Sequence, residues 1–143
     1  MFVRKPYIRS IVRGDPGFFT GNVWIERLVW AEDNSHITAS IVTFEPRART
    51  AWHAHPLGQL LIVIGGCGLV QKWGESAEII QPGDAVWIPP GVKHWHGAID
   101  TTILSHIAIQ EALDGKTADF MEHVSDEQYQ AALKSVEKIR SKV

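Results

Sequence analysis

The stretch "WHAHPLGQ", Trp52 to Gln59, holds two histidines one residue apart and a glutamine four residues after the second. Side chains two positions apart on a β-strand point to the same face, so His53 and His55 would present their rings together. Neutral imidazoles are common ligands of transition metals. The stretch therefore predicts part of a metal site, which residues elsewhere in the chain must complete.

Composition describes the kind of protein that carries this stretch. The chain has 143 residues, 45% of them hydrophobic, and a formal net charge of -2, so we expect one folded domain. Because there is no basic surplus, we expect neither nucleic acid nor an anionic membrane as partner. A single cysteine and the absence of an apolar signal-like run near the start favour a cytoplasmic location.

Turn residues recur along the chain and separate short segments rich in Val, Ile, Thr and Trp. Many short strands at such spacing are typical of a β-sandwich or a small barrel. The expected strands cover residues 22–30, 37–44, 59–64, 68–73, 77–80, 85–88, 95–99 and 102–110.

The C-terminal part of the chain has a different character, because residues 117–143 contain neither Pro nor Gly. Ser125 and Gln128 form a capping box, which predicts that a helix starts there. An apolar stripe at helical spacing would pack on the barrel or on a second subunit; it consists of Tyr129, Leu133, Val136 and Ile139. We expect a helical tail over about 117–141, after a barrel over about 19–110, in one domain of residues 1–143.

A second group of polar residues lies further along, in "PGDAVWIPPGVKHWHG", residues 82–97. His94 follows a tight Pro-Gly turn, and His96 shares its face while Trp95 points the opposite way. In the first group, Gln59 shares a face with apolar residues of 59–64, and a polar group there needs a partner. The alternatives are metal ligation and a hydrogen bond within the core.

The histidine stretch resembles the first motif of the cupin superfamily. That motif runs Gly, five residues, His-x-His, three or four residues, Glu, six residues, Gly. Here His53 and His55 are followed after three residues by Gln59 and after six more by Gly66, and Arg47 replaces the first Gly. Gln59 therefore stands where the family has a glutamate.

The second motif of the superfamily runs Gly, five residues, Pro-x-Gly, two residues, His, three residues, Asn. The chain matches it with Gly83, Pro89, Gly91 and His94, and Ala98 replaces the final Asn. The resemblance implies an all-β fold, a double-stranded β-helix (the cupin or jelly-roll barrel), with a short C-terminal helical segment. It also implies a homodimer or a higher homo-oligomer, because cupins often associate through sheet edges and terminal segments.

The resemblance further implies a divalent metal ion held by His53, His55, Gln59 and His94. Manganese is the expected ion, and Fe²⁺, Ni²⁺, Co²⁺ and Zn²⁺ are alternatives that suit the same donors. From about Phe19 to Tyr129 the chain resembles small bacterial monocupins related to carboxymuconolactone-decarboxylase-associated proteins. These include the manganese-dependent hydroxynitrile lyases, which implies a small-molecule substrate and the cleavage or formation of cyanohydrins.

Gln59 also bears on the reaction. A neutral amide leaves the full +2 charge on the ion, which makes the centre a stronger Lewis acid and favours lyase chemistry over oxygen chemistry. A metal-dependent dioxygenase or other oxidative cupin is the alternative enzyme, and a non-catalytic binder of small molecules is a third class.

The strand over 102–110 contributes a further histidine. His106 shares a face with Gln110, and if that face looks inward both line the metal cavity. We expect His106 to take the proton of a substrate hydroxyl as a general base, with a buried structural histidine as the alternative. The expected wall of the substrate pocket consists of Ser40, Val42, Thr50, His96 and Gln110.

Overall fold

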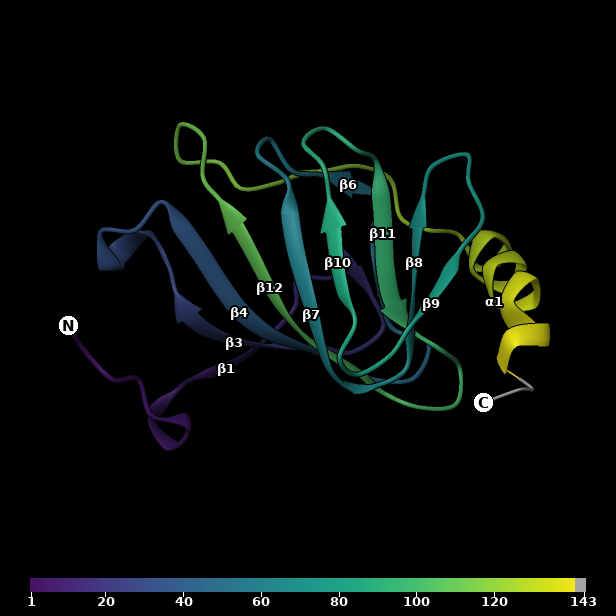
Figure 1. The fold of residues 1–143 in the computed structure, drawn as a ribbon, viewed down its shortest axis with the longest axis horizontal. Coiled ribbons are helices and arrows are strands. Elements are labelled where there is room, and N and C mark those ends of the chain that lie inside the picture. Colours follow the sequence, from purple (N-terminus) through teal and green to yellow (C-terminus); the bar gives the residue numbers. More distant parts are fainter. Residues whose placement is uncertain (141–143) are drawn as a thin grey trace.

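The strands form two β-sheets that face each other, and one helix lies at the C-terminal end (Figure 1). Buried and exposed side chains alternate along the long strands. This computed structural model describes residues 1–140, and the side chains of residues 138–140 lie outside the description. The predicted end of the tail at residue 141 and the side chain of Ile139 therefore fall outside the described part. The predicted all-β jelly-roll with a C-terminal helical segment is confirmed.

The first sheet has six strands, and every neighbouring pair in it is antiparallel. Its order is β1 (Ile11–Arg13), β3 (Val23–Val29), β4 (Ile37–Phe44), β12 (Leu104–Glu111), β7 (Gln59–Gly66) and β10 (Ala85–Ile88).

The second sheet has seven strands, several of which are only two residues long. The path runs β13 (Asp119–Phe120), β6 (His53–Ala54), β11 (His94–Ala98), β5 (Arg49–Thr50) and β2 (Phe19–Thr20). In addition, β8 (Gly68–Lys72) pairs with β11, and β9 (Glu78–Ile80) pairs with β8. Two short 3₁₀ helices, Pro6–Ile8 and Ala31–Asp33, complete the described elements.

All eight predicted strands are present, with ends within two residues of the expected ones. The alternation predicted for the site also holds, because Gln59 and His106 are buried between the sheets with Leu61, Val63, Leu104 and Ala108 from the same faces, and Gln110 is partly buried. The sequence patterns missed five strands of two or three residues, which are β1, β2, β5, β6 and β13. A segment of two or three residues is too short to show a period.

Two apolar clusters stabilise this arrangement. The first fills the space between the sheets and includes Phe44, Leu61 and Leu104. The second lies between the outer face of the second sheet and the helix, where Trp95 packs near Tyr129. Trp95 therefore faces the helix while His94 and His96, its neighbours on β11, face inward, as the alternation predicts.

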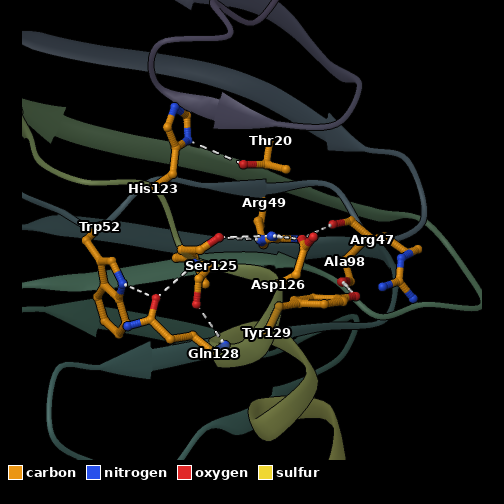
Figure 2. Close-up of polar contacts among 11 residues, drawn as sticks. Thr20, Arg47, Arg49, Trp52, Ala98, His123, Ser125, Asp126, Gln128 and Tyr129 are labelled. Atoms are coloured by element: carbon orange, nitrogen blue, oxygen red, sulfur yellow. Dashed lines mark hydrogen bonds and ion pairs between the residues drawn. The ribbon is translucent and has the colours of Figure 1, made fainter.

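The helix α1 (Asp126–Arg140) begins at the predicted capping box. Gln128 N donates to Ser125 Oγ at 3.0 Å, and Ser125 N donates to Gln128 Oε1 at 2.9 Å (Figure 2). The expected helical tail from about 117 is shorter than predicted, since residues 117–125 form a connection that contains β13. Among the described residues, none of the helices has the length and apolar character needed to cross a membrane.

A buried arginine fixes the start of α1 to the barrel. Arg49 is 3% exposed; its Nε and Nη2 donate to Val124 O at 3.2 and 2.9 Å, and Nη2 also lies 2.9 Å from Asp126 Oδ1 (Figure 2). Its guanidinium stacks 4.6 Å from the Tyr129 ring centre, and Tyr129 donates to Ala98 O at 2.7 Å. The connection before α1 is therefore held firmly at its C-terminal end.

The backbone conformation explains why the family motif has glycine at the positions of Gly66 and Arg47. Gly66 has φ of 73°, and a Cβ there would lie 1.8 Å from Ile103 O, so no other residue fits. Arg47, which replaces a motif Gly, has the same left-handed φ of 73°. Its exposed side chain lies over the Tyr129 ring at 5.4 Å, and its N donates to Ile99 O at 3.0 Å.

Candidate metal centre

Three histidines are oriented in the same way by backbone carbonyls. The Nδ1 atoms of His53, His55 and His94 lie 2.8, 2.8 and 2.9 Å from the carbonyl oxygens of Ala51, Thr117 and Val92. A carbonyl oxygen only accepts hydrogen bonds, so each Nδ1 carries the ring proton. Each Nε2 therefore keeps a free lone pair, which is the form that binds a metal ion.

Gln59 is oriented by a second amide. Its Nε2 donates to Gln110 Oε1 at 3.0 Å, and Gln110 Nε2 in turn donates to Thr38 Oγ1. This chain fixes which end of the Gln59 amide is the oxygen, and it leaves Oε1 free to bind another group.

Several acceptors at the site are buried without a hydrogen-bond partner in the described residues. They include His55 Nε2, Gln59 Oε1 and His94 Nε2. Leaving buried polar atoms unsatisfied costs about 1–3 kcal/mol each, so a cluster of them indicates a missing ligand. The atoms left free are lone-pair donors of the kind that a divalent cation takes, so the residues fit a metal ion.

The positions of the ring nitrogens group three histidines that differ in part from the predicted ligands. One nitrogen each from His53, His94 and His96 lies within 4.8 Å of the others, so these three histidines can hold a metal ion. The ring centres of His53 and His94 are 4.2 Å apart, whereas His96 lies 5.4 Å from His53 and 5.8 Å from His94. His53 and His94 belong to the predicted ligands, and His96 was predicted to line the pocket instead.

His96 and His106 form a hydrogen-bonded pair across the two sheets. Nε2 of His106 lies 3.0 Å from Nδ1 of His96, while His106 Nδ1 and His96 Nε2 have no partner in the described residues. Both rings are fully or almost fully buried. Whichever way the proton between them points, one of the two outer nitrogens is an acceptor and the other a donor.

Burial keeps the histidines of the site neutral. It lowers the pKa of His94 and of His106 to about 4, and it lowers the pKa of His55 as well. Burial, followed by the neighbouring histidines, holds the pKa of His53 and of His96 well below the usual range. Neutral rings near pH 7 are available to bind a metal ion or to accept a proton.

These side chains open into a cavity of about 170 Å³ inside the barrel. Every predicted site residue except His94 lines it; these are Ser40, Val42, Thr50, His53, His55, Gln59, His96, His106 and Gln110. His94 lies directly behind, with its ring centre 4.2 Å from that of His53. The structure thus brings together residues from six strands, β4, β5, β6, β7, β11 and β12, and His55 from the position directly after β6.

The sequence analysis missed part of the cavity lining, which consists of Phe19, Ile25, Phe44, Ala108, Thr117, Ala118 and Phe120. Phe44 and Ala108 share faces with Val42 and His106, so strand alternation was a signal that could have found them. Thr117 and Phe120 come from the connection to α1, which crosses the top of the barrel in Figure 1. No local pattern predicts that this connection returns to the site.

Comparison with known proteins agrees with this geometry. The sequence profile of the Cupin domain family matches residues 40–109. The chain is also 58% identical over 129 residues to an (R)-mandelonitrile lyase of Granulicella tundricola, a match that covers 90% of this chain and 98% of that protein. The chain belongs to the cupin family. This assignment confirms the resemblance drawn from the two histidine motifs.

Solved structures place this cupin among others of the same fold. A crystal structure of a cupin-like protein from Thermotoga maritima is 42% identical, with a TM-score of 0.82, and the match covers 90% of this chain and 97% of that one. A polyketide cyclase from Streptomyces resistomycificus is 17% identical with a TM-score of 0.71 and 91% of both chains covered, and so shares the fold alone.

Proposed function

We propose that this cupin is a metal-dependent hydroxynitrile lyase, which cleaves a cyanohydrin into hydrogen cyanide and an aldehyde or ketone, or forms it in reverse. One observation carries the proposal: free acceptor atoms of buried ligand-type side chains and a neutral histidine pair meet in one small cavity. The 58% identity with a mandelonitrile lyase over nearly the whole chain supports the same reaction.

In this proposal the ion is held by His53, His55, Gln59 and His94, with manganese as the preferred metal. The three rings share carbonyl-bound Nδ1 atoms and free Nε2 atoms, and Gln59 adds its free oxygen. When bound, a divalent ion with four neutral ligands acts as a Lewis acid that stabilises negative charge on the substrate oxygen.

The tautomers of the histidine pair follow from the role given to His106. If His106 Nε2 donates to His96 Nδ1, then His106 Nδ1 is the free base and His96 Nε2 carries a proton. A protonated His96 Nε2 does not bind a metal ion, so His96 serves the substrate by donating a hydrogen bond to its oxygen. The same assignment explains why His96 is not among the proposed ligands although it lies close to His53.

The proposed step uses His106 as the base. The cyanohydrin hydroxyl gives its proton to His106 Nδ1, and the bond between the carbinol carbon and the nitrile carbon breaks. The electron pair of that bond leaves with cyanide while the carbonyl double bond forms. Cyanide then takes the proton from His106, so an aldehyde and hydrogen cyanide are released and the ring is neutral again.

The remaining polar residues of the wall position the reacting groups. Thr50 accepts a hydrogen bond from His96 N at 3.2 Å, which fixes the strand that carries the donor ring. Gln110 holds Gln59, whereas Ser40 and Val42 border the cavity next to His106 on the neighbouring strand β4. We assign these four residues to substrate and ligand positioning.

A cleavage assay tests the proposal. Protein purified without chelators is expected to contain a bound divalent metal and to cleave mandelonitrile, and added manganese is expected to restore cleavage after chelation. If neither bound metal nor any metal-stimulated cleavage is found, the proposal is wrong. Oxygen consumption with a catechol or a diketone in place of cleavage would assign the site to an oxidative cupin.

We also propose that the protein is a homodimer in solution, joined through the outer face of the six-stranded sheet. The helix covers the outer face of the second sheet, but the described chain contains no element that covers the first. That open face is apolar; it carries Trp24, Ile41, Leu60, Ile62, Ile64, Trp87, Ile107 and Ile109. Ile64 and Trp87 are 47% and 59% exposed.

The dimensions of the face support this partner. Five strands at about 4.8 Å spacing, each up to about 27 Å long, give a flat area of about 500 Å² before side-chain relief. Stable interfaces bury about 800 Å² of accessible surface per partner, and side-chain relief adds to the flat area of this face. Ile107→Lys should yield a monomer by light scattering, and Gln130→Lys on the exposed side of α1 should not. An unchanged dimer in the first variant, or a monomeric wild type, would contradict this interface.

The cytoplasmic location stays a prediction, which rests on the presence of a single cysteine, Cys67.

A further inference from the structure

Phe120 lies between two other rings at the mouth of the cavity. Its ring stacks on Phe18 with centres 4.2 Å apart and an interplanar angle of 18°, and on His53 with 5.1 Å and 22°. Phe18 and Phe120 are 41% and 36% exposed, whereas His53 is 2% exposed. The stack therefore runs from the surface to the ring of a proposed metal ligand.

The position of Phe120 is fixed by the backbone on both sides. In β13, Phe120 pairs with His53 of β6, and Met121 N donates to Trp52 O at 2.8 Å while Trp52 N donates to Glu122 O at 2.9 Å. Two residues after Glu122, Val124 O accepts a hydrogen bond from Arg49 Nη2 at 2.9 Å. Phe120 is therefore a rigid part of the cavity wall.

The stack decides which part of Phe120 a substrate meets. Phe18 stacks on the ring at 4.2 Å and His53 at 5.1 Å, one from the exposed side and one from the buried side, so we infer that the two rings flank opposite faces and leave the ring edge for the cavity. The edge of an aromatic ring is positive and the face is negative, and an edge therefore attracts the face of a second aromatic ring. A saturated side chain in the same place lacks this attraction.

The cavity also limits the size of the group beside Phe120. An apolar cavity of about 150 Å³ holds one benzene molecule, and this cavity has about 170 Å³. Phe19, Phe44 and Phe120 are aromatic neighbours in its lining, and Phe44 and Phe120 also contact the histidine rings. One benzene-sized ring with a small polar group fits such a space.

We propose that Phe120 is a specificity-determining residue that selects substrates carrying a single aromatic ring on the reacting carbon. Its edge contacts the face of that ring, and Phe18 fixes the edge in place from the outer side. The polar end of the substrate then lies toward the histidines. This inference rests on the proposed lyase function for the reaction, but not for the selection of an aromatic ligand.

The test compares an aromatic with an aliphatic substrate on the manganese-loaded protein. The probes are mandelonitrile and the cyanohydrin of 2-methylpropanal, and kcat/KM is measured for both. Phe120→Leu keeps an apolar group of similar size but removes the ring, so the preference for mandelonitrile should fall about two- to tenfold. Phe120→Trp should keep the preference, as should the control Phe2→Leu at an exposed residue outside the cavity lining.

An unchanged preference in a folded Phe120→Leu protein overturns the inference. If the wild type cleaves neither cyanohydrin, the lyase proposal fails. The role of Phe120 is then tested by calorimetric titration, which compares the affinities for benzaldehyde and 2-methylpropanal. Tighter binding of benzaldehyde that Phe120→Leu reduces would support the role of Phe120 without the reaction. Equal binding of the two aldehydes by the wild type, or no binding of either, would refute it.

Discussion

Gln110 donates its own amide to Thr38 and accepts the amide of Gln59 through a 3.0 Å hydrogen bond, so one glutamine sets the orientation of the other. An unrestrained amide can turn by 180° and present nitrogen in place of oxygen. Because Gln59 Nε2 is taken up by Gln110, its oxygen is the atom left free in the cavity. Gln110 thereby supports a neutral ligand where most cupins, by the motif, have a carboxylate.

Gln110→Ala should weaken metal binding without removing a proposed ligand. Groups that orient metal ligands typically contribute 10–100-fold to affinity, so we expect the Kd for manganese to rise by about that factor. Competition with a fluorescent chelator measures it. Gln130→Ala, at an exposed helix residue, is the matched control and should leave the Kd unchanged.

Gln59→Glu should have opposite effects on binding and on cleavage. A carboxylate adds a negative charge to the ligand set, which tightens manganese binding but lowers the Lewis acidity of the ion. We therefore expect a lower Kd together with a lower kcat for mandelonitrile, measured on fully loaded protein. A variant that binds more tightly and cleaves as fast as wild type would show that ligand charge does not control the rate.

Substitution of the two paired histidines separates their roles. His106→Ala removes the proposed base, and the loss of general base catalysis should lower kcat by about 100–10,000-fold. His96→Ala removes a hydrogen-bond donor and the partner that fixes His106, so a smaller but clear loss is expected. Values of kcat measured at saturating manganese show which of the two variants loses more activity. If His96→Ala is inactive and His106→Ala retains most activity, the tautomers of the pair are reversed.

The metal-free protein should lose stability as the pH falls. Burial lowers the pKa of His94 and His106 to about 4, whereas an unfolded histidine titrates near 6.5. Between these values the unfolded chain binds protons that the folded chain does not, so unfolding becomes easier as the pH drops from about 6.5 to about 4. Each such histidine contributes at most about 1.4 kcal/mol per pH unit to this slope.

Urea unfolding in the presence of a chelator measures that slope. His106→Gln removes one of the buried rings, so the free energy of unfolding should depend less steeply on pH in this window. His36→Gln is the control, because the His36 side chain is exposed in the folded protein. Equal slopes for wild type and His106→Gln would mean that His106 does not stay neutral in the folded state.

Much of the site follows from local patterns. The His-x-His stretch and the Pro-x-Gly turn before His94 single out the expected metal ligands, and the period of two along β12 puts His106 and Gln110 on one face. Ser40, Val42 and Thr50 lie outside these patterns. Tight turns with left-handed backbone, as at Gly66 and Gly91, mark the ends of these strands. Because turn chemistry and alternation are local properties, a single sequence reveals them.

Other features depend on contacts between distant segments. His96 and His106 lie on strands of different sheets, so alternation points both inward without predicting that they bond to each other. Thr117 holds His55, and Phe120 stacks on His53, although both follow the last long strand. The pairing of β13 with β6, the backbone hydrogen bonds of Trp52 and the Arg49 contacts return that connection to the barrel mouth, and no period in the sequence encodes them.

The ligand set of the metal is the central claim, and metal content tests it most directly. Chelated protein is reloaded with manganese, desalted and analysed for metal per chain, in the wild type and in single variants. We predict one ion per chain in the wild type and in His96→Ala, and a content close to zero in His55→Ala and His94→Ala. Loss of the ion in His96→Ala with full retention in His55→Ala would contradict the account, because the ion would then be held by His53, His94 and His96.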